Sequence, residues 1–211
     1  MNESIILIEE FNNNELNSQL RWFSPPKEWE LDRQESKLIF QAEKGTDFWQ
    51  KTHYDFQVDN GHFLFYEMRG DFRLTTKVKS KPVNLYDQAG LMVRLSSDTW
   101  LKTSVEYLND SDSRLGAVVT NQGYSDWSCQ KFSGKQDFLY YRITKKENTF
   151  YAESSLDGFS WNLMRMACLF EKKEIIQVGI YACSPQGEGY KPEFHFIKIE
   201  TIDKDTEVFL K

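Results

Sequence analysis

The sequence predicts an all-β protein in which two antiparallel sheets pack face to face. Apolar and polar residues alternate along much of the chain, most clearly over residues 72–79 and 89–96, and this is the period of a half-buried strand. About a dozen such runs are short and are separated by turn signals at close spacing, which is typical of a sandwich or a barrel. A chain of 211 residues can bury one large core, so we expect residues 1–211 to form a single domain.

The expected strands follow one another with short connections and cover residues 37–42, 63–67, 72–79, 88–96, 101–108, 116–120, 126–132, 138–144, 149–155, 176–182 and 194–202. Polar, Pro-containing or Gly-containing loops are expected at residues 12–18, 23–29, 109–113 and 185–191. Residues 169–176 are compatible with a short helical turn. Near residue 158, a glycine permits the positive φ of a tight turn between two strands.

Composition excludes several classes of partner. The net charge of −6 and pI of about 5.2 argue against nucleic acid, because phosphate binding needs a basic field. The same charge disfavours an anionic membrane surface. No apolar run approaches the roughly 20 residues of a membrane-spanning helix, and the run at residues 5–8 is too short for a signal sequence. We therefore expect a cytoplasmic protein with no nucleic-acid and no membrane partner.

Neither a metal nor a cofactor is expected. The three cysteines are widely spaced without a CxxC pair, the three histidines are scattered, and no phosphate-binding glycine loop is present. The cysteines are interpreted as buried thiols in a reducing compartment. Asp110 and Asp112 suggest either a calcium site or a solvated hairpin turn; the turn is favoured because an EF-hand frame is missing.

Strand pairing predicts one polar sheet face. Turns centred on Asp98, Ser111 and Gly123 would set Arg94 opposite Lys102, Lys102 opposite Thr120, and Thr120 opposite Asp126. The same register places on this face a second row with Met92, Ser104 and Ser128 and a third row with Glu106 and Gln130. The opposite face is expected to be core, with Leu91, Val93, Leu101, Val105, Tyr107, Ala117 and Val119. Because long strands in a sandwich often curve, the polar face is expected to form a concave groove.

Two interpretations of this face stay open. Arg94, Lys102, Glu106 and Asp126 have the chemistry to bind sugar hydroxyls or a carboxylate. The alternative is an ordinary solvated sheet face with cross-strand ion pairs.

The aromatic residues near this face also have two interpretations. Trp49, Trp100 and Trp127 are candidate platforms for the flat C–H faces of sugars, although tryptophans often lie in the core. Of the three, Trp127 is favoured as a binding residue. His53, in the segment Thr46-Asp-Phe-Trp-Gln-Lys-Thr-His-Tyr-Asp-Phe, is either a packed aromatic or a site residue.

Catalysis is the second functional hypothesis. A retaining glycosidase needs two carboxyl groups about 5–5.5 Å apart. The Glu-x-Asp-x-Glu pattern of concanavalin-like glucanases is absent, because position 108 is leucine. If the protein is an enzyme, Glu106 or Asp126 is the candidate acid or base, with His53 as an alternative base.

Several motifs together resemble the uncharacterised bacterial YesU-like family. They are Thr46-Asp-Phe-Trp-Gln-Lys-Thr-His-Tyr, Asp87-Gln-Ala-Gly-Leu-Met-Val-Arg94, Trp100-Leu-Lys-Thr-Ser-Val-Glu106-Tyr, Ser125-Asp-Trp-Ser128 and Ser155-Leu-Asp-Gly-Phe-Ser-Trp161. The resemblance implies a concanavalin A-like lectin/glucanase jelly-roll β-sandwich. It also directs attention to Asp87 and Gln88, which fall beside the polar face. Phe48 and Phe56 are then expected in the core, and Asp47, Trp49 and His53 at the edge of the groove.

The favoured function is oligosaccharide binding in a groove on the polar concave sheet. The expected ligand is an oligosaccharide or another small polar molecule. Its predicted contacts are Asp47, Trp49, His53, Asp87, Gln88, Arg94, Lys102, Glu106, Asp126 and Trp127. The alternatives are a carbohydrate-active hydrolase or lyase, and a protein-interaction module in which the face is a subunit contact, for example in a homodimer.

Overall fold

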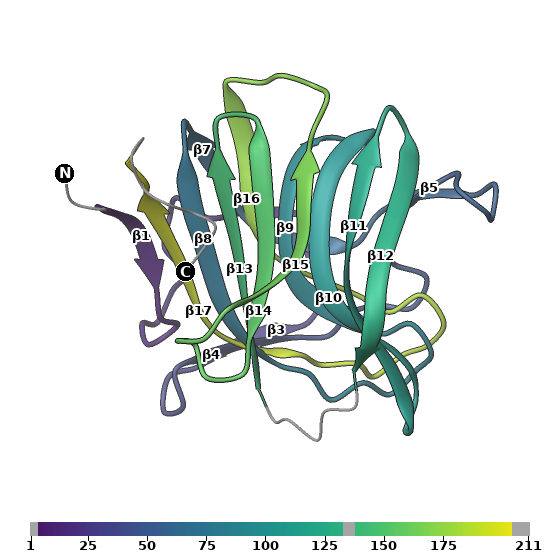
Figure 1. The fold of residues 1–211 in the computed structure, drawn as a ribbon. Coiled ribbons are helices and arrows are strands. Elements are labelled where there is room, and N and C mark those ends of the chain that lie inside the picture. The colour runs from purple at the N-terminus through teal and green to yellow at the C-terminus, as the bar shows by residue number, and fades with distance from the viewer. Residues whose placement is uncertain (1–3, 133–137, 204–211) are drawn as a thin grey trace.

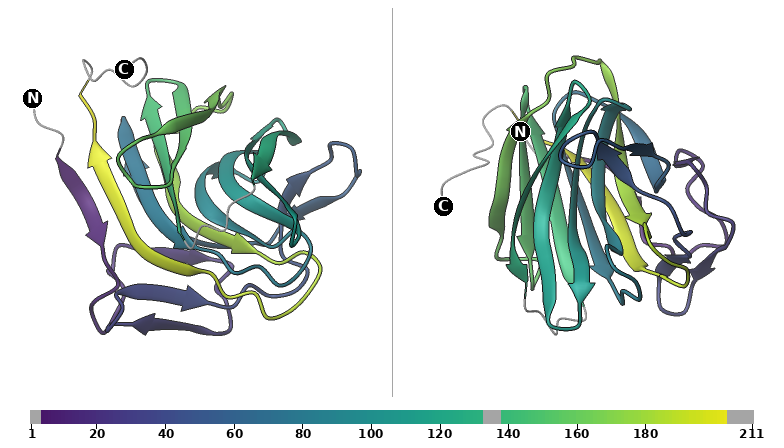
Figure 2. Two further views of the ribbon diagram at one scale, coloured as in Figure 1. Left: turned by 60° about the horizontal axis from the view of Figure 1, so that its bottom comes forward. Right: turned by 90° about the vertical axis from the view of Figure 1, so that its right-hand side faces the viewer.

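The computed structural model describes residues 4–132 and 138–203 and confirms the predicted all-β sandwich of two antiparallel sheets (Figure 1). The two sheets are curved and lie face to face, as the turned views in Figure 2 show. Among the described residues, no helix is long and apolar enough to cross a membrane.

The eight-stranded sheet has the order β15-β14-β13-β8-β17-β4-β3, and β1 pairs with β17 beside this path. Its strands are β1 (Ile5–Glu9), β3 (Trp29–Asp32), β4 (Lys37–Phe40), β8 (Phe72–Lys79), β13 (Leu139–Lys146), β14 (Thr149–Ser155), β15 (Asn162–Cys168) and β17 (Glu193–Thr201). Burial alternates strictly along β8, so its apolar residues reach the core and its basic residues point outward.

The seven-stranded sheet has the order β12-β11-β10-β9-β16-β7-β2. Its strands are β2 (Arg21–Phe23), β7 (His62–Arg69), β9 (Gln88–Ser96), β10 (Thr99–Asn109), β11 (Asp112–Asn121), β12 (Tyr124–Phe132) and β16 (Ile175–Cys183). Its inner face packs on the other sheet. Leu91, Val93, Leu101, Ala117 and Val119 are buried there as predicted, whereas Val105 and Tyr107 are only half-buried.

The expected helical turn at residues 169–176 is wrong. β15 ends at Cys168 and β16 begins at Ile175, and an irregular loop joins them. The sequence also gave no strand signal for β15. This is an edge strand whose exposed and half-buried residues do not alternate regularly, so no period of two is visible.

The predicted register between β9, β10 and β11 is wrong by two residues, but the faces are right. Arg94 lies opposite Trp100 and not Lys102, and Lys102 lies opposite Val118 and not Thr120. An even shift returns each side chain to the same face of the sheet. Bulges between Thr99 and Trp100 and after Tyr107 accompany the change.

Between β11 and β12 the register is wrong by one residue, and this reverses β12. Gln122 and Gly123 both have positive φ, at 53° and 74°, as the two central residues of a type I′ hairpin require. The turn is therefore centred between these residues. Thr120 lies opposite Ser125, so Trp127 is on the polar outer face and Asp126 is on the opposite one.

A hairpin covers part of the outer face of the seven-stranded sheet. This covering hairpin, residues 47–59, contains β5 (Phe48–Gln50) and β6 (Gln57–Asp59), and its tip projects beyond β12 in Figure 1. Phe48 is fully buried and forms a second small core with sheet residues. That core comprises Phe48, Phe63, Phe65, Met92, Trp100, Val118, Tyr181 and Cys183.

Four contacts from polar residues hold the covering hairpin on the sheet. The Lys102 ammonium, with a residue exposure of only 2%, donates to Asp47 Oδ1 at 3.2 Å and to the Phe48 carbonyl at 2.7 Å. Arg94 Nη2 pairs with Asp59 Oδ2 at 2.6 Å. The Gln50 amide donates to Ser125 Oγ at 2.9 Å. These polar side chains therefore fix the hairpin instead of facing solvent.

We predict that Lys102→Met lowers the free energy of unfolding by about 3 kcal/mol, because it leaves the partly buried Asp47 carboxylate without its cation. Urea denaturation followed by tryptophan fluorescence measures this loss. Lys191→Met is the matched control, since it removes an exposed pair with Glu28 and should cost less than about 1 kcal/mol. Equal losses in the two variants would show that Lys102 does not anchor the hairpin.

Candidate functional site

The uncovered part of the outer face centres on Glu106, which the sequence had placed there. Glu106 is on β10, opposite Arg114 of β11 and Gln88 of β9. Its Oε2 accepts a long hydrogen bond of 3.4 Å from Gln88 Nε2. No ion pair with Glu106 is found among the described residues, although the carboxyl group is half-buried. An oxygen acceptor is thus held at the surface of the sheet with spare capacity for a ligand.

Burial raises the pKa of Glu106 from 4.5 to about 7. Lys102 opposes the rise, but its ammonium already bonds to Asp47, and the Asp47 charge raises the pKa again. Near neutral pH, Glu106 is therefore present both as an acid that donates a hydrogen bond and as a carboxylate that accepts one.

Aromatic side chains project from the tip of the covering hairpin, within electrostatic range of this carboxyl group. The aromatic tip consists of Trp49, His53, Tyr54 and Phe56. Tyr54 contacts all three of the others, with ring centroids 4.6–5.8 Å away. Partial burial raises the pKa of the Tyr54 hydroxyl, and the neighbouring Tyr86 and Glu106 groups raise it further, which places these three groups in one electrostatic neighbourhood.

The tip is compact and strained. Lys51, His53 and Asp55 all have positive φ, between 53° and 70°, which is uncommon for residues other than glycine. The Trp49 indole donates to the Thr52 carbonyl at 2.9 Å, and the Asp55 amide donates to the Lys51 carbonyl at 2.8 Å. Such strain persists only where surrounding contacts impose it, and it concentrates at functional sites.

The structure separates the candidate aromatic residues. Trp100 is fully buried under Phe48, so it belongs to the second core. Trp127 is 39% exposed on the outer face, opposite Val118. Phe56, expected in the core, is 42% exposed at the tip, so that expectation is wrong. Trp49 is half-buried and His53 is exposed.

Asp126 does not share the face with Glu106. The one-residue shift in β12 turns it to the other side, where its carboxylate pairs with Arg165 of β15 at 3.1 Å. The predicted placement of Asp126 on the polar face is therefore wrong. The two carboxyl groups considered for acid–base catalysis lie on opposite faces of the sheet and do not form a pair.

The remaining candidates are mostly engaged in the fold. Asp87 is buried and accepts hydrogen bonds from Ser184 Oγ and from the Val83 and Asn84 amides. Gln88 is buried between Tyr181 and Glu106. Arg94, Lys102 and Asp47 hold the covering hairpin, as described above. Of the charged candidates, Glu106 is the one that borders the uncovered part of the face.

Sequence reasoning missed Tyr54, Tyr86 and Arg114 as neighbours of Glu106. Tyr86 directly precedes the Asp87-Gln88 motif and has a φ of 69°, a conformation that no sequence pattern revealed. Arg114 lies directly opposite Glu106 but pairs with Asp112 at 2.9 Å. The only signal for Arg114 was its place two residues before Gly116 on the same alternating strand.

No metal centre is evident in the described part of the chain, where no group of three or more His, Cys, Asp or Glu residues could hold an ion. Asp110 accepts a hydrogen bond from Tyr107 and Asp112 pairs with Arg114, so both serve the β10–β11 hairpin. Cys183 is buried, whereas Cys129 and Cys168 are exposed, so the expectation of buried thiols is wrong for two of the three.

We predict that Glu106→Gln stabilises the protein above pH 7 and has little effect at pH 4.5. The folded pKa is raised, so the folded state binds more protons than the unfolded state between pH 4.5 and about 7. The free energy of unfolding of the unmodified protein therefore decreases as the pH rises through this window. The variant has no carboxyl group at position 106, so it does not lose this contribution. Solvent access limits the gain to about 1–2 kcal/mol.

Urea denaturation of both proteins from pH 4.5 to 8 measures this difference. Glu30→Gln, at an exposed carboxyl group on β3, controls for the loss of one charge. A stability difference for Glu106→Gln that does not grow with pH would contradict the raised pKa.

Comparison with known proteins gives a family and a fold. "Regulation of enolase protein 1" of Saccharomyces cerevisiae is 36% identical over 185 residues, covering 88% of this chain and 90% of that protein. A functionally unknown protein from Saccharomyces cerevisiae, solved by crystallography, has a TM-score of 0.80 and 32% identity, covering 88% of this chain and 97% of that chain. The GH43 BlXynB protein from Bacillus licheniformis has a TM-score of 0.75 at 16% identity, covering 92% of this chain and 39% of that chain. That last similarity concerns the fold alone.

The family assignment spans most of the chain. A family model described as "protein of unknown function (DUF1349)" matches residues 22–202, which include both sheets except β1 and the first residue of β2. The chain belongs to the DUF1349 family.

Proposed function

We propose that this protein binds a neutral oligosaccharide on the uncovered part of its outer sheet face. The observation that carries the proposal is Glu106, a half-buried carboxyl group without an ion-pair partner among the described residues. The exposed aromatic tip lies within electrostatic range of it through Tyr54. A sugar ring needs both features, because its hydroxyl groups require hydrogen-bond partners and its C–H faces pack on aromatic rings.

Each side chain has a defined task in this proposal. Tyr54, which is 54% exposed, stacks on one sugar ring, and its position is fixed by Phe56 and Trp49. Glu106 accepts hydrogen bonds from the hydroxyl groups of the same sugar. Trp127, farther along the outer face, offers a second platform for another sugar of the chain. Two platforms along one face suit an oligosaccharide better than a monosaccharide.

Fold and resemblance support the same ligand class. About two fifths of the BlXynB chain shares this fold, and the whole of BlXynB is a GH43 protein; one GH43 protein of the same fold similarity is described as a glycoside hydrolase. The motifs that resemble the YesU-like family point to the concanavalin A-like superfamily, whose members include lectins. The carboxylate of Glu106 would repel a uronic acid, and this is why we propose a neutral sugar.

Isothermal titration with neutral gluco-, xylo- and galacto-oligosaccharides and with an oligouronate tests the proposal. We expect saturable binding of at least one neutral oligosaccharide and weaker binding of the oligouronate. Tyr54→Ala and Glu106→Gln should each weaken binding about tenfold, through the loss of one stacking platform and one charged acceptor.

Trp29→Ala is the matched control, because Trp29 is an exposed tryptophan of the other sheet, on β3. Its removal should leave binding unchanged. If the folded protein binds no member of the panel, the proposal fails. If Trp29→Ala weakens binding as much as Tyr54→Ala does, the ligand does not lie on the outer face.

A second candidate function is regulation of a partner enzyme, and the β14–β15 loop favours it. Phe159 is 90% exposed at the end of a tightly bonded turn. Asp157 Oδ1 accepts hydrogen bonds from Ser155 Oγ and from the Phe159 and Ser160 amides at 2.7–2.9 Å. These bonds lower the pKa of Asp157 to about 2, so the turn is preorganised at neutral pH.

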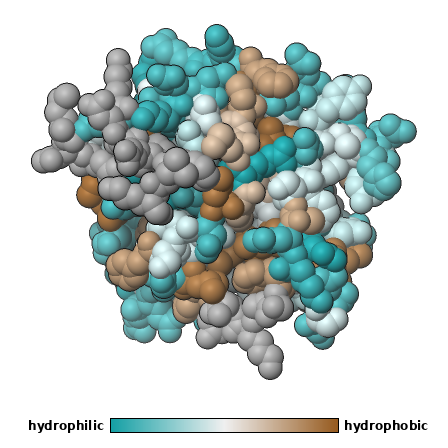
Figure 3. Space-filling model, viewed as in Figure 1, coloured by the Kyte–Doolittle hydropathy of each residue, from teal (hydrophilic) through white to brown (hydrophobic). Residues whose placement is uncertain are grey.

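Apolar surface extends from this turn. Leu156 and the β15 residues Leu163 and Met166 are exposed, and Figure 3 shows apolar side chains across the middle of the viewed face between polar margins. A rigid exposed aromatic residue of this kind is typical of a protein-interaction anchor. The name of the yeast relative makes enolase the first partner to test.

We predict that purified enolase from the same organism binds the full chain and that Phe159→Ala weakens this binding at least tenfold. Titration calorimetry or sedimentation velocity measures the affinity. Phe170→Ala, which removes an exposed phenylalanine from the β15–β16 loop, is the control and should have no effect. The absence of any complex at high micromolar concentrations would rule this function out.

A further inference from the structure

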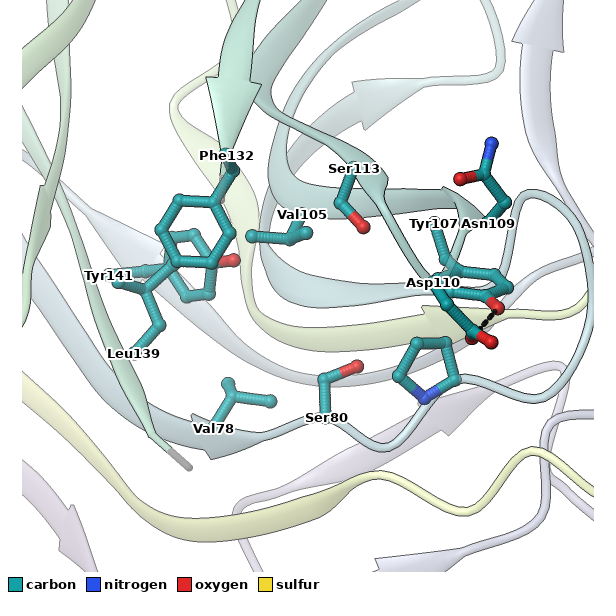
Figure 4. A pocket seen from close by; sticks show the side chains of 11 residues that line it. Val78, Ser80, Val105, Tyr107, Asn109, Asp110, Ser113, Phe132, Leu139 and Tyr141 are labelled. Carbon is teal, nitrogen blue, oxygen red and sulfur yellow. Dashed lines mark hydrogen bonds between the residues drawn. The ribbon is translucent and has the colours of Figure 1, made fainter. Parts of the chain in front are cut away.

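A cavity of about 270 Å³ opens between the two sheets, on the side of β10 away from Glu106 (Figure 4). Its inner end is lined by Val78 of β8 and by Leu139 and Tyr141 of β13, all of which are buried. Val105 of β10 forms another wall. Phe132 of β12 also lines the cavity, and Figure 4 shows its ring between Val105 and the side chains of Leu139 and Tyr141.

The other end of the cavity is polar. Tyr107, Ser113 and Asp110 lie there, and Asp110 is exposed to solvent. Tyr107 Oη donates to Asp110 Oδ1 at 2.6 Å, so the carboxylate is held at the mouth, as the dashed line in Figure 4 shows. The cavity therefore changes from a closed apolar end to an open anionic end.

The cavity explains why two side chains that the strand pattern predicts to be buried are partly exposed to solvent. Val105 and Tyr107 alternate onto the core face of β10, yet both are only half-buried. They stay half-buried because the space in front of them is unfilled. A cavity in the core lowers stability, so a well-lined one with a polar mouth is a candidate ligand site.

We propose that this cavity is a second ligand site, for a small monocyclic molecule whose hydrogen-bond-donating head group, an amine or an alcohol, meets Asp110. An engineered apolar cavity of roughly 150 Å³ accepts benzene, so 270 Å³ accommodates one ring with a short substituent. The ring packs among Val78, Val105 and Leu139, and the head group donates to the carboxylate at the mouth. A ligand bearing a carboxylate is disfavoured there.

Three probes of equal size test the proposal on the full chain: benzylamine, benzyl alcohol and benzoate. Calorimetry or ligand-observed NMR should show saturable binding of benzylamine and benzyl alcohol, with dissociation constants on the order of 1 mM. Benzoate should bind at least about tenfold more weakly than benzylamine. If no probe binds the folded protein, or if benzoate binds as well as benzylamine, the proposal is overturned.

Variants locate the binding. Val105→Phe fills the cavity and should abolish binding of both favoured probes, whereas Ile175→Phe, which enlarges an exposed apolar residue elsewhere, should not. Circular dichroism checks that Val105→Phe is folded. Asp110→Asn keeps an acceptor for Tyr107 but removes the charge, so it should reduce the preference for benzylamine over benzoate at least threefold, even if Val105→Phe does not fold.

The outer-face variant separates this site from the proposed oligosaccharide site. Tyr54→Ala should leave the affinity for benzyl alcohol unchanged. If Tyr54→Ala lowers that affinity, or if a folded Val105→Phe does not, the probes bind outside the cavity and the inference is wrong.

Discussion

The buried ammonium of Lys102 is the interaction on which the outer face depends. It lies inside the second core, where an unpaired charge would be strongly unfavourable, and the covering hairpin supplies both of its acceptors. With the hairpin in place, Phe48 seals Trp100 and Tyr181 from water. The same ammonium acts on Glu106. Burial is the main cause of the raised Glu106 pKa, Lys102 lowers that pKa in part, and the Asp47 charge that pairs with Lys102 raises it again.

The fold could be predicted from sequence because its strongest signal, the period of two, survives errors in detail. The predicted turns around Asp98 and Ser111 give a strand pairing that is wrong by two residues. Side chains alternate between the two faces with a period of two, so this error leaves each residue on its predicted face. At Gln122-Gly123 the error was one residue, and Asp126 changed sides. The correct register requires a two-residue turn in which both Gln122 and Gly123 have positive φ. Glycine adopts positive φ readily, but glutamine does so rarely, so the sequence does not indicate this turn.

The site was less predictable, because polarity does not reveal what covers a residue. Arg94 and Lys102 have the same alternation as solvent-facing residues, yet a segment some 35 to 55 positions earlier in the chain covers both. The aromatic tip was recognised as unusual from composition, but its strained backbone and the approach of Tyr54 to Glu106 are tertiary facts. Asp87 was expected near the ligand because it lies in one of the motifs that resemble the YesU-like family. Its carboxylate instead accepts hydrogen bonds from the Val83 and Asn84 amides and so stabilises the turn at residues 83–84.

The ion pair between Asp126 and Arg165 links β12 and β15, which are the last strands of the two sheets on one side of the sandwich. A terminal strand has a row of backbone N–H and C=O groups that can recruit a strand from another molecule. Here the Asp126–Arg165 ion pair connects β12 to β15 and places a charged side chain on each of these terminal strands. A strand that tried to extend either sheet would have to desolvate or displace these charges. Asp126, which the sequence predicted as a ligand-binding residue, thus places charge at the open edges of both sheets.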